Sequence, residues 1–204
     1  NLLRYGESAF DKLITLFDHS NPRYRAAALR VYPLSRINRI EYQTLHKRAQ
    51  DSSRKVRQVA LKRLVRHSDF SAGSLRSLQS SKYTDVRRFV IEATSRLSEQ
   101  KGTGIVKTFL FDPATKVRKA AIREFIQREL QGWQSVAEKS LQADNPEIQK
   151  ATASALLHHS SSKAKQILQD YLETADNEEF KQWIRKHRNT GPRRRDQREQ
   201  IQIK

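Results

Sequence analysis

A phrase of fixed spacing that recurs about every 31 residues constrains this chain more than any other feature. The clearest copy is DSSRKVRQVALKRL at residues 51–64, where Val56 is followed by Arg57, Ala60 and Leu64. Positions 0, +4 and +8 of the phrase fall on one stripe of a helix, so this stripe is expected to be buried. The first positions, called anchors below, are residues 24, 56, 86, 117, 148 and 180. This period predicts an array of helical repeats.

A second amphipathic segment precedes each anchor helix, so each repeat is predicted to be a helix pair. In the first repeat, Phe10, Leu13, Ile14 and Phe17 share one helical stripe. In the third, the segment near 74–78 is short and rich in serine. Six pairs then account for residues up to 186, and residues 187–204 form a basic tail. The predicted fold class is therefore all-α, with a repeat domain over 1–186.

Several of the predicted turns contain a polar residue followed by proline. Asn21-Pro22, Asp112-Pro113 and Asn145-Pro146 are each predicted to supply a helix cap and a proline in the first helical position. In the third copy of the phrase, Thr94 occupies the +8 position, and the stripe is predicted to shift toward Ala93 and Leu97.

A two-helix repeat of about 31 residues, whose second helix carries this phrase, resembles the HEAT and HEAT-like (phycobilisome-lyase type) repeats. The closest copy is DPATKVRKAA at residues 112–121. The resemblance implies a right-handed α-solenoid of about six antiparallel helix pairs that serves mainly as a binding scaffold. It also implies that the arginines at position +1 form a structural ladder with acidic residues or carbonyls of neighbouring repeats. These arginines are Arg25, Arg57, Arg87 and Arg118.

The composition argues against most enzyme classes. The chain has no cysteine, which excludes thiolate chemistry and cysteine-ligated metals. Adjacent His158 and His159 point about 100° apart on a helix and make poor joint metal ligands. The six glycines form no phosphate-binding loop. We therefore predict a non-catalytic protein without a cofactor.

The positive charge is unevenly distributed. Net charge is +18, with 21 basic and 9 acidic residues up to residue 102 and an even balance over 103–184. The helical period turns several cations of the anchor helices away from the buried stripe. Arg54 and Lys55 also lie in a first helical turn, where the helix dipole disfavours cations. The predicted binding residues are Arg30, Arg54, Lys55, Lys62, Arg63, Arg66, Arg88, Lys119 and Arg123, with Arg193, Arg194 and Arg195 of the tail.

An extended polyanion is the simplest partner for stacked cations, so we predict binding to the backbone of DNA or RNA. The alternative is a protein-interaction scaffold that binds an acidic partner. Another domain of a larger parent chain would be one such partner. The chain lacks methionine, so residue 1 is not an initiator and a larger parent is expected. Most aromatic residues fit the buried stripes and are predicted to be core: Phe10, Phe17, Tyr42, Phe109, Phe125 and Trp133.

Overall fold

A computed structural model describes residues 7–188 of the chain, and all regular structure in this range is helical. The residues group into two compact units, Asn1–Ala93 and Thr94–Lys204. The predicted all-α class is confirmed. No helix in the described range is long and apolar enough to span a membrane.

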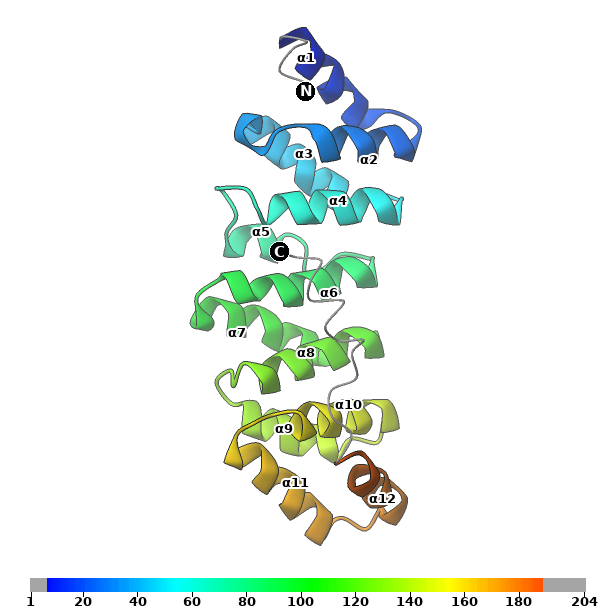
Figure 1. Cartoon of the computed structure of the whole chain (residues 1–204), viewed down its shortest axis with the longest axis vertical. Coiled ribbons are helices and arrows are strands. Elements are labelled where there is room, and N and C mark those ends of the chain that lie inside the picture. The colour runs from blue at the N-terminus through cyan, green and yellow to red at the C-terminus, as the bar shows by residue number, and fades with distance from the viewer. Residues whose placement is uncertain (1–6, 189–204) are drawn as a thin grey trace. The chain divides into compact units, whose positions relative to one another are not determined.

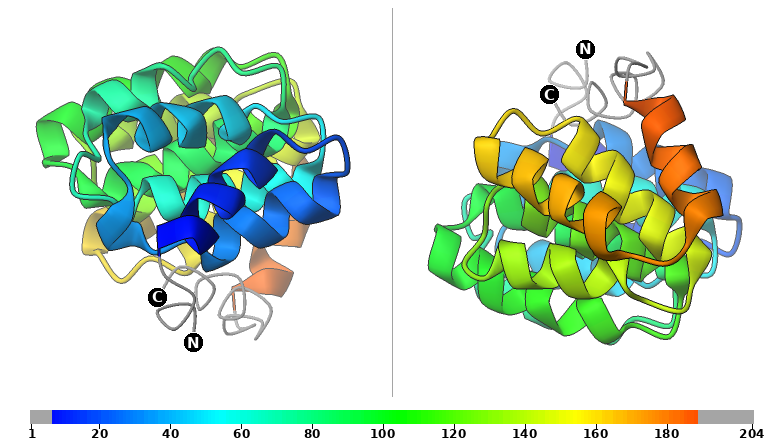
Figure 2. Two further views of the ribbon diagram at one scale, coloured as in Figure 1. Left: turned by 90° about the horizontal axis from the view of Figure 1, so that it is seen from above. Right: turned by 90° about the horizontal axis from the view of Figure 1, so that it is seen from below.

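The first unit contains three helix pairs, α1 with α2, α3 with α4, and α5 with α6 (Figure 1). Seen from above, α1 crosses α2 at an angle (Figure 2, left). Its elements are α1 (Glu7–Thr15), η2 (Leu16–Asp18), α2 (Pro22–Val31), η3 (Leu34–Arg36), α3 (Arg39–Ala49), α4 (Arg54–Leu64), α5 (Ala72–Arg76) and α6 (Thr84–Ala93). The five residues of α5 confirm that the third repeat opens with a short helix.

The second unit also contains three helix pairs, α7 with α8, α9 with α10, and α11 with α12. The last pair lies in the foreground when the molecule is seen from below (Figure 2, right). Its elements are η4 (Thr94–Arg96), α7 (Glu99–Thr108), η5 (Phe109–Phe111), α8 (Thr115–Gln127), α9 (Trp133–Leu141), α10 (Pro146–Leu157), α11 (Ser162–Thr174) and α12 (Glu178–His187).

Asparagine caps begin several of the anchor helices. The side chain of Asn21 accepts a hydrogen bond from the Arg23 amide at 2.9 Å, and Pro22 is the first residue of α2. Asn145 and Pro146 begin α10 in the same way. The prediction for Asp112-Pro113 was wrong, because α8 begins only at Thr115. Asp112 instead accepts from the Ala114 amide at 2.8 Å and closes a turn before the helix.

The predicted stripe forms the core of both units. Val56, Ala60 and Leu64 are fully buried, as are their counterparts Val117, Ala121 and Phe125. The six aromatic residues predicted to be core are also buried. Tyr24 contradicts the prediction, since 53% of its surface is exposed. It belongs to the first described repeat, where no described helix of a preceding repeat covers it, and its ring packs edge-on against His19.

Thr94 corrects a prediction in part. Ala93 is buried as predicted, but the stripe does not shift away from Thr94, which is completely buried, and Leu97 remains partly exposed. The Arg128 guanidinium lies 3.1 Å from the Thr94 hydroxyl and 2.9 Å from a Glu124 carboxylate oxygen. A hydroxyl with a hydrogen-bond partner can occupy a core position at little cost.

Buried arginines join the repeats of the first unit. The Arg25 guanidinium donates to both carboxylate oxygens of Asp51 at 2.7 and 2.8 Å and to the carbonyls of His19 and Ser20. Arg57 likewise donates to both oxygens of Asp85 and to the carbonyls of Asp51 and Ser52. Each arginine therefore holds the loop before its own helix and a carboxylate of the next repeat. This confirms the predicted ladder for Arg25 and Arg57.

The ladder changes along the chain. Arg87 and Arg118 also donate to the carbonyl six residues earlier, that of Ser81 at 2.6 Å and that of Asp112 at 2.7 Å. In the third repeat, Ser81 occupies the place that Asp51 has in the second. The carboxylate that binds Arg57 comes instead from Asp85, in the first turn of α6.

The ladder predicts that Asp51→Asn lowers the free energy of unfolding by about 3 kcal/mol, because buried Arg25 loses its counter-charge. Urea unfolding followed by circular dichroism measures this change. Asp11→Asn is the matched control, since Asp11 is exposed and forms no ion pair within the described residues. Equal unfolding midpoints for the two variants would contradict a stabilising role for the Asp51 ion pair.

The same site predicts a pH dependence. Burial tends to raise the pKa of Asp51, but hydrogen bonds from Arg25, the Ser53 amide and Arg48 outweigh burial and lower it. A lowered pKa in the folded state gives stability that is complete above the ordinary aspartate pKa and is lost as pH falls through the lowered value. The stability gap between wild type and Asp51→Asn should therefore narrow between about pH 5 and pH 2. A gap that stays constant in urea titrations over this range would contradict the linkage.

Candidate binding surface

Four cations form a regular array on the outer side of α2 and α4. They occupy the positions one residue before the anchor and six residues after it, and we call them the cation quartet: Arg23, Arg30, Lys55 and Lys62. In each helix the two cations are seven residues apart, so they share one face at a separation of about 10 Å. Lys62 is partly exposed and the other three are exposed.

Helices α2 and α4 lie side by side and run in the same direction (Figure 1). Arg63 of α4 donates to the carbonyls of Arg30 and Tyr32, so the C-terminal turns of the two helices are adjacent. Packed helices have axes about 8–10 Å apart. The cation quartet therefore marks the corners of an area of roughly 10 by 10 Å.

No carboxylate within residues 7–188 forms an ion pair with the cation quartet or with Arg54. Other cations of the first unit are paired: Arg36 with Glu7, Lys47 with Asp18 and Arg57 with Asp85. Charges about 10 Å apart are only partly screened at physiological salt, where the Debye length is about 8 Å. The array is therefore a region of uncompensated positive potential.

Two cations of the quartet, Arg23 and Lys55, and the neighbouring Arg54 also oppose the helix dipole. Arg23 lies in the first turn of α2, and Arg54 and Lys55 lie in the first turn of α4. A cation there costs about 0.3–1 kcal/mol relative to a neutral residue. Helix stability alone does not account for their placement.

The third repeat ends the array. At the quartet positions α6 carries Asp85 and Glu92; Asp85 binds Arg57, and a Glu92 oxygen lies 3.8 Å from Arg88. The predicted stripe is thus interrupted by two acids within the first unit.

The other predicted residues have different surroundings. Arg63 serves the fold through its two carbonyl acceptors, and burial together with the nearby Arg66 charge lowers its pKa. Arg66 is exposed just beyond the end of α4. In the second unit, Lys119 pairs with Glu147 at 3.2 Å, and Arg123 is exposed on α8. Arg193, Arg194 and Arg195 lie outside the described residues.

Sequence reasoning missed Arg23. The prediction included Lys55, one residue before the anchor of the second repeat, but not Arg23 at the same position of the first repeat. Its signal was the spacing of seven residues to Arg30, which Lys55 and Lys62 repeat.

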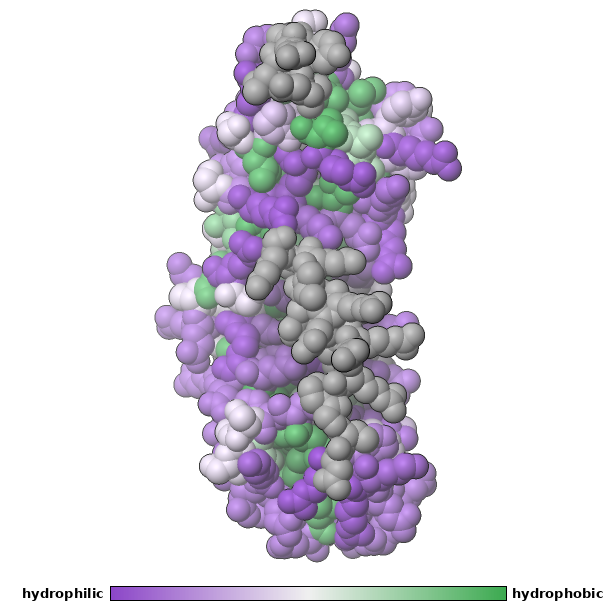
Figure 3. All heavy atoms as spheres, in the orientation of Figure 1, coloured by the Kyte–Doolittle hydropathy of each residue, from purple (hydrophilic) through white to green (hydrophobic). Residues whose placement is uncertain are grey.

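Hydrophobic side chains also reach the surface. Figure 3 shows a largely hydrophilic face on which hydrophobic residues gather over α2 and again in the region of α9 to α11. On α2, Tyr24 and Val31 are 53% and 47% exposed, and each is the sequence neighbour of a quartet arginine. On η5, Phe111 is 85% exposed. Sequence reasoning overlooked Phe111, although it falls off the stripe formed by Phe109 and its neighbours.

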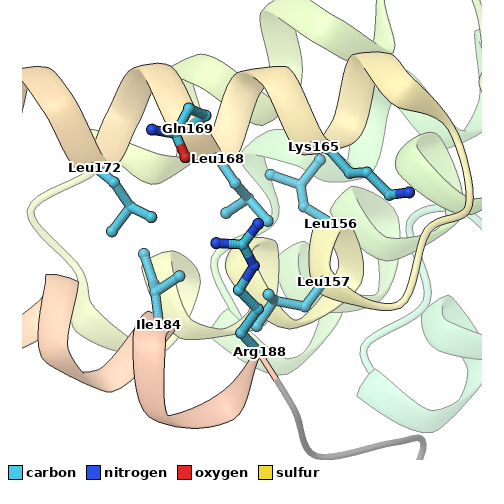
Figure 4. A pocket seen from close by; sticks show the side chains of 8 residues that line it. All are labelled: Leu156, Leu157, Lys165, Leu168, Gln169, Leu172, Ile184 and Arg188. Atoms are coloured by element: carbon cyan, nitrogen blue, oxygen red, sulfur yellow. The ribbon is translucent and has the colours of Figure 1, made fainter.

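Several concave sites lie within the second unit. One is a groove of about 620 Å³ over α8, with α7 and η5 on one side and α9 on the other. Another, of about 190 Å³, is lined by Leu156, Leu157, Leu168, Leu172 and Ile184, and the Arg188 side chain extends across it (Figure 4). Among the residues that the structure describes, no group of three or more histidine and acidic side chains is placed to hold a metal ion.

Comparison with known proteins agrees with the fold. A family model described as HEAT repeats matches residues 103–186. No curated protein matches the chain. An engineered protein of known crystal structure is 17% identical, with 88% of this chain and 93% of that chain covered and a TM-score of 0.42.

A designed armadillo repeat protein, solved in complex with the peptide (KR)4, is 16% identical. The match covers 87% of this chain and 95% of that chain, with a TM-score of 0.44. The peptide is a ligand of that designed protein. The chain is thus made of helical repeats, and residues 103–186 are similar to HEAT repeats.

Arg63 is assigned to the fold and its neighbour Lys62 to the cation quartet. Measurements of stability can separate these two roles. Arg63→Ala leaves two carbonyls of the preceding repeat without their donor, so it should lower the free energy of unfolding by about 1–3 kcal/mol. Lys62→Ala should change it by less than about 0.5 kcal/mol. Urea titrations of both variants measure the difference. Equal stability of the two variants would show that Arg63 does not stabilise the fold.

Proposed function

We propose that this chain is a non-catalytic binding scaffold and that the cation quartet binds an acidic segment of a partner protein. The observation that carries the proposal is the set of uncompensated cations on α2 and α4, three of which lie in first helical turns that disfavour them. A partner that supplies carboxylates would neutralise the array and remove that cost. The narrower resemblance to phycobilisome-lyase type repeats stays a prediction, and the proposal does not depend on it.

The surroundings of the cation quartet favour a protein partner. Tyr24 and Val31 place exposed apolar surface beside Arg23 and Arg30. Arginine and tyrosine are both enriched at protein interfaces, where apolar contacts sit beside polar ones. A partner recognised only through phosphates would make no use of this apolar surface.

Nucleic acid is the second candidate, and the charge distribution supports it. Residues 1–102 carry a net charge of +12, and an array of cations can follow a phosphate backbone without contacting bases. Stacking of unpaired bases needs exposed aromatic rings; α4 carries none, and on α2 Tyr24 is the one exposed ring. This candidate therefore relies mainly on backbone contacts, with the tail arginines as a further contribution.

Charge reversal tests the proposal. The variant with Arg23→Glu, Lys55→Glu and Lys62→Glu should bind a labelled acidic peptide of about 20 residues, made of glutamate and leucine, about tenfold or more weakly than wild type. Fluorescence anisotropy at about 0.15 M salt measures the affinity. The variant should have about the stability of wild type, since glutamate suits the first turns that hold Arg23 and Lys55 but not the last turn that holds Lys62.

The matched control reverses three exposed cations of the second unit: Lys101→Glu, Lys116→Glu and Lys163→Glu. The change in net charge is the same, and each of these lysines lies in a first helical turn, as do Arg23 and Lys55; Lys62 lies in the last turn of α4. Equal loss of peptide binding in both variants would show that net charge, rather than the cation quartet, is responsible.

A DNA duplex of about 20 base pairs, titrated across a salt series, separates the two candidates. Duplex affinity that persists at about 0.15 M salt, survives removal of residues 189–204 and is lost in the quartet variant would favour nucleic acid. Retention of the acidic peptide with loss of the duplex at that salt would favour a protein partner.

A further inference from the structure

The groove of the second unit has an apolar floor and accessible walls. Its floor is formed by Ile122 and Phe125 of α8, which are buried. One wall carries Leu110 and Phe111, and the other is the face of α9 that carries Ser135, Val136, Lys139 and Ser140. Its volume of about 620 Å³ falls within the range of roughly 300–1,000 Å³ that is usual for ligand sites.

Phe111 is the most unusual side chain of this groove. In the sequence Phe109-Leu110-Phe111, the first residue is buried, the second lines the groove and the third is 85% exposed. Burial of a phenylalanine side chain is favourable, so an exposed one leaves free energy available for binding. Large exposed apolar residues beside a concave site mark interaction surfaces more often than isolated ones do.

The rim of the groove is positively charged. Lys107 and Lys139 are exposed and form no ion pair within the described part of the chain. Arg118 donates to the carbonyls of Asp112 and Pro113, so it serves mainly the fold. Asp144 is the one acidic residue of the described lining. An occupant that matches this rim carries apolar groups and negative charge together.

We propose that the groove binds a short acidic and apolar peptide segment of a partner protein. A large apolar side chain of the segment would pack against Phe111 and Val136 over the floor formed by Ile122. Carboxylates beside that side chain would pair with Lys107 and Lys139. This site is separate from the cation quartet, which belongs to the first unit, so the proposal does not depend on the function assigned to the quartet.

Selection from a phage-displayed library of random peptides of about 12 residues tests the proposal without a known partner. The full chain is the target. Peptides that also bind the Phe111→Asp variant are discarded, because they bind elsewhere on the chain. The recovered sequences should share one or two large apolar residues flanked by aspartate or glutamate. Recovery of no peptide, or of basic or purely apolar sequences, would overturn the proposal.

Variants then locate the site of the most enriched peptide, synthesised and titrated by calorimetry. Phe111→Ala should weaken its binding by about tenfold or more, as loss of a central apolar contact does at other interfaces. Lys107→Glu with Lys139→Glu should weaken it by a similar factor. Unfolding midpoints of these variants should equal that of wild type, because the three side chains are exposed.

Two controls separate this site from other surfaces. Ile40→Ala removes an isoleucine that is 72% exposed and lies in the first unit, so it should leave peptide affinity unchanged. The quartet variant should also retain the peptide. Loss of binding in the quartet variant with full binding in Phe111→Ala would place the peptide on the cation quartet and overturn the proposal.

Discussion

The arginine at position +1 of the first four anchor phrases makes the interactions on which these repeats depend. Its guanidinium is planar and has five N–H donors, so one edge can bind a carboxylate while another binds carbonyls. Arg25 and Arg57 use one edge for Asp51 and Asp85 and another for the loop before their own helix. One side chain thus satisfies loop carbonyls and sets the spacing to the next repeat.

A buried cation of this kind requires acceptors on every side, and the loops provide them. Carbonyls at the start of an anchor helix would otherwise be left without donors as the loop packs against its neighbours. Tyr83 adds the face of its ring, 3.8 Å from the Arg57 guanidinium carbon. Lysine at this position would supply one point of charge without the planar fork, and would not replace the arginine.

The presence or absence of hydrogen-bond acceptors around the side chain divides the cations of the chain into two classes. Arg25, Arg57 and Arg63 have carbonyl or carboxylate acceptors in the first unit and serve the fold. The cation quartet has no carboxylate partner among residues 7–188. Net charge counts both classes alike. It therefore overstates the number of cations that are available to bind a partner. The quartet and the groove beside Phe111 are the two surfaces for which we propose a partner.

Much of the fold could be predicted because it depends on local pattern. The spacing of Val56, Ala60 and Leu64 dictates a buried stripe, and Asn-Pro pairs dictate where α2 and α10 begin. The failures had tertiary causes. Whether Tyr24 is covered depends on a neighbouring repeat, and Thr94 stays buried because Arg128, distant in sequence, lies beside its hydroxyl.

The candidate sites were less predictable than the fold. Outward positions could be assigned from the helical period, but whether a cation there is paired depends on the next repeat, as Lys119 and Glu147 show. The groove could not be predicted at all, since it depends on how far α9 lies from η5 above α8.

The ladder weakens toward the end of the second unit. Gln149 occupies the arginine position of α10 and makes no side-chain hydrogen bond within the described residues. Lys181 of α12 binds Glu178 of its own helix at 2.9 Å. Leu156 of α10, Leu168 of α11 and Ile184 of α12 instead line one small cavity with apolar side chains, so the last pair can open without breaking an arginine ladder. The amide hydrogens of α11 and α12 are therefore expected to be among the first in the second unit that local opening exposes to solvent exchange.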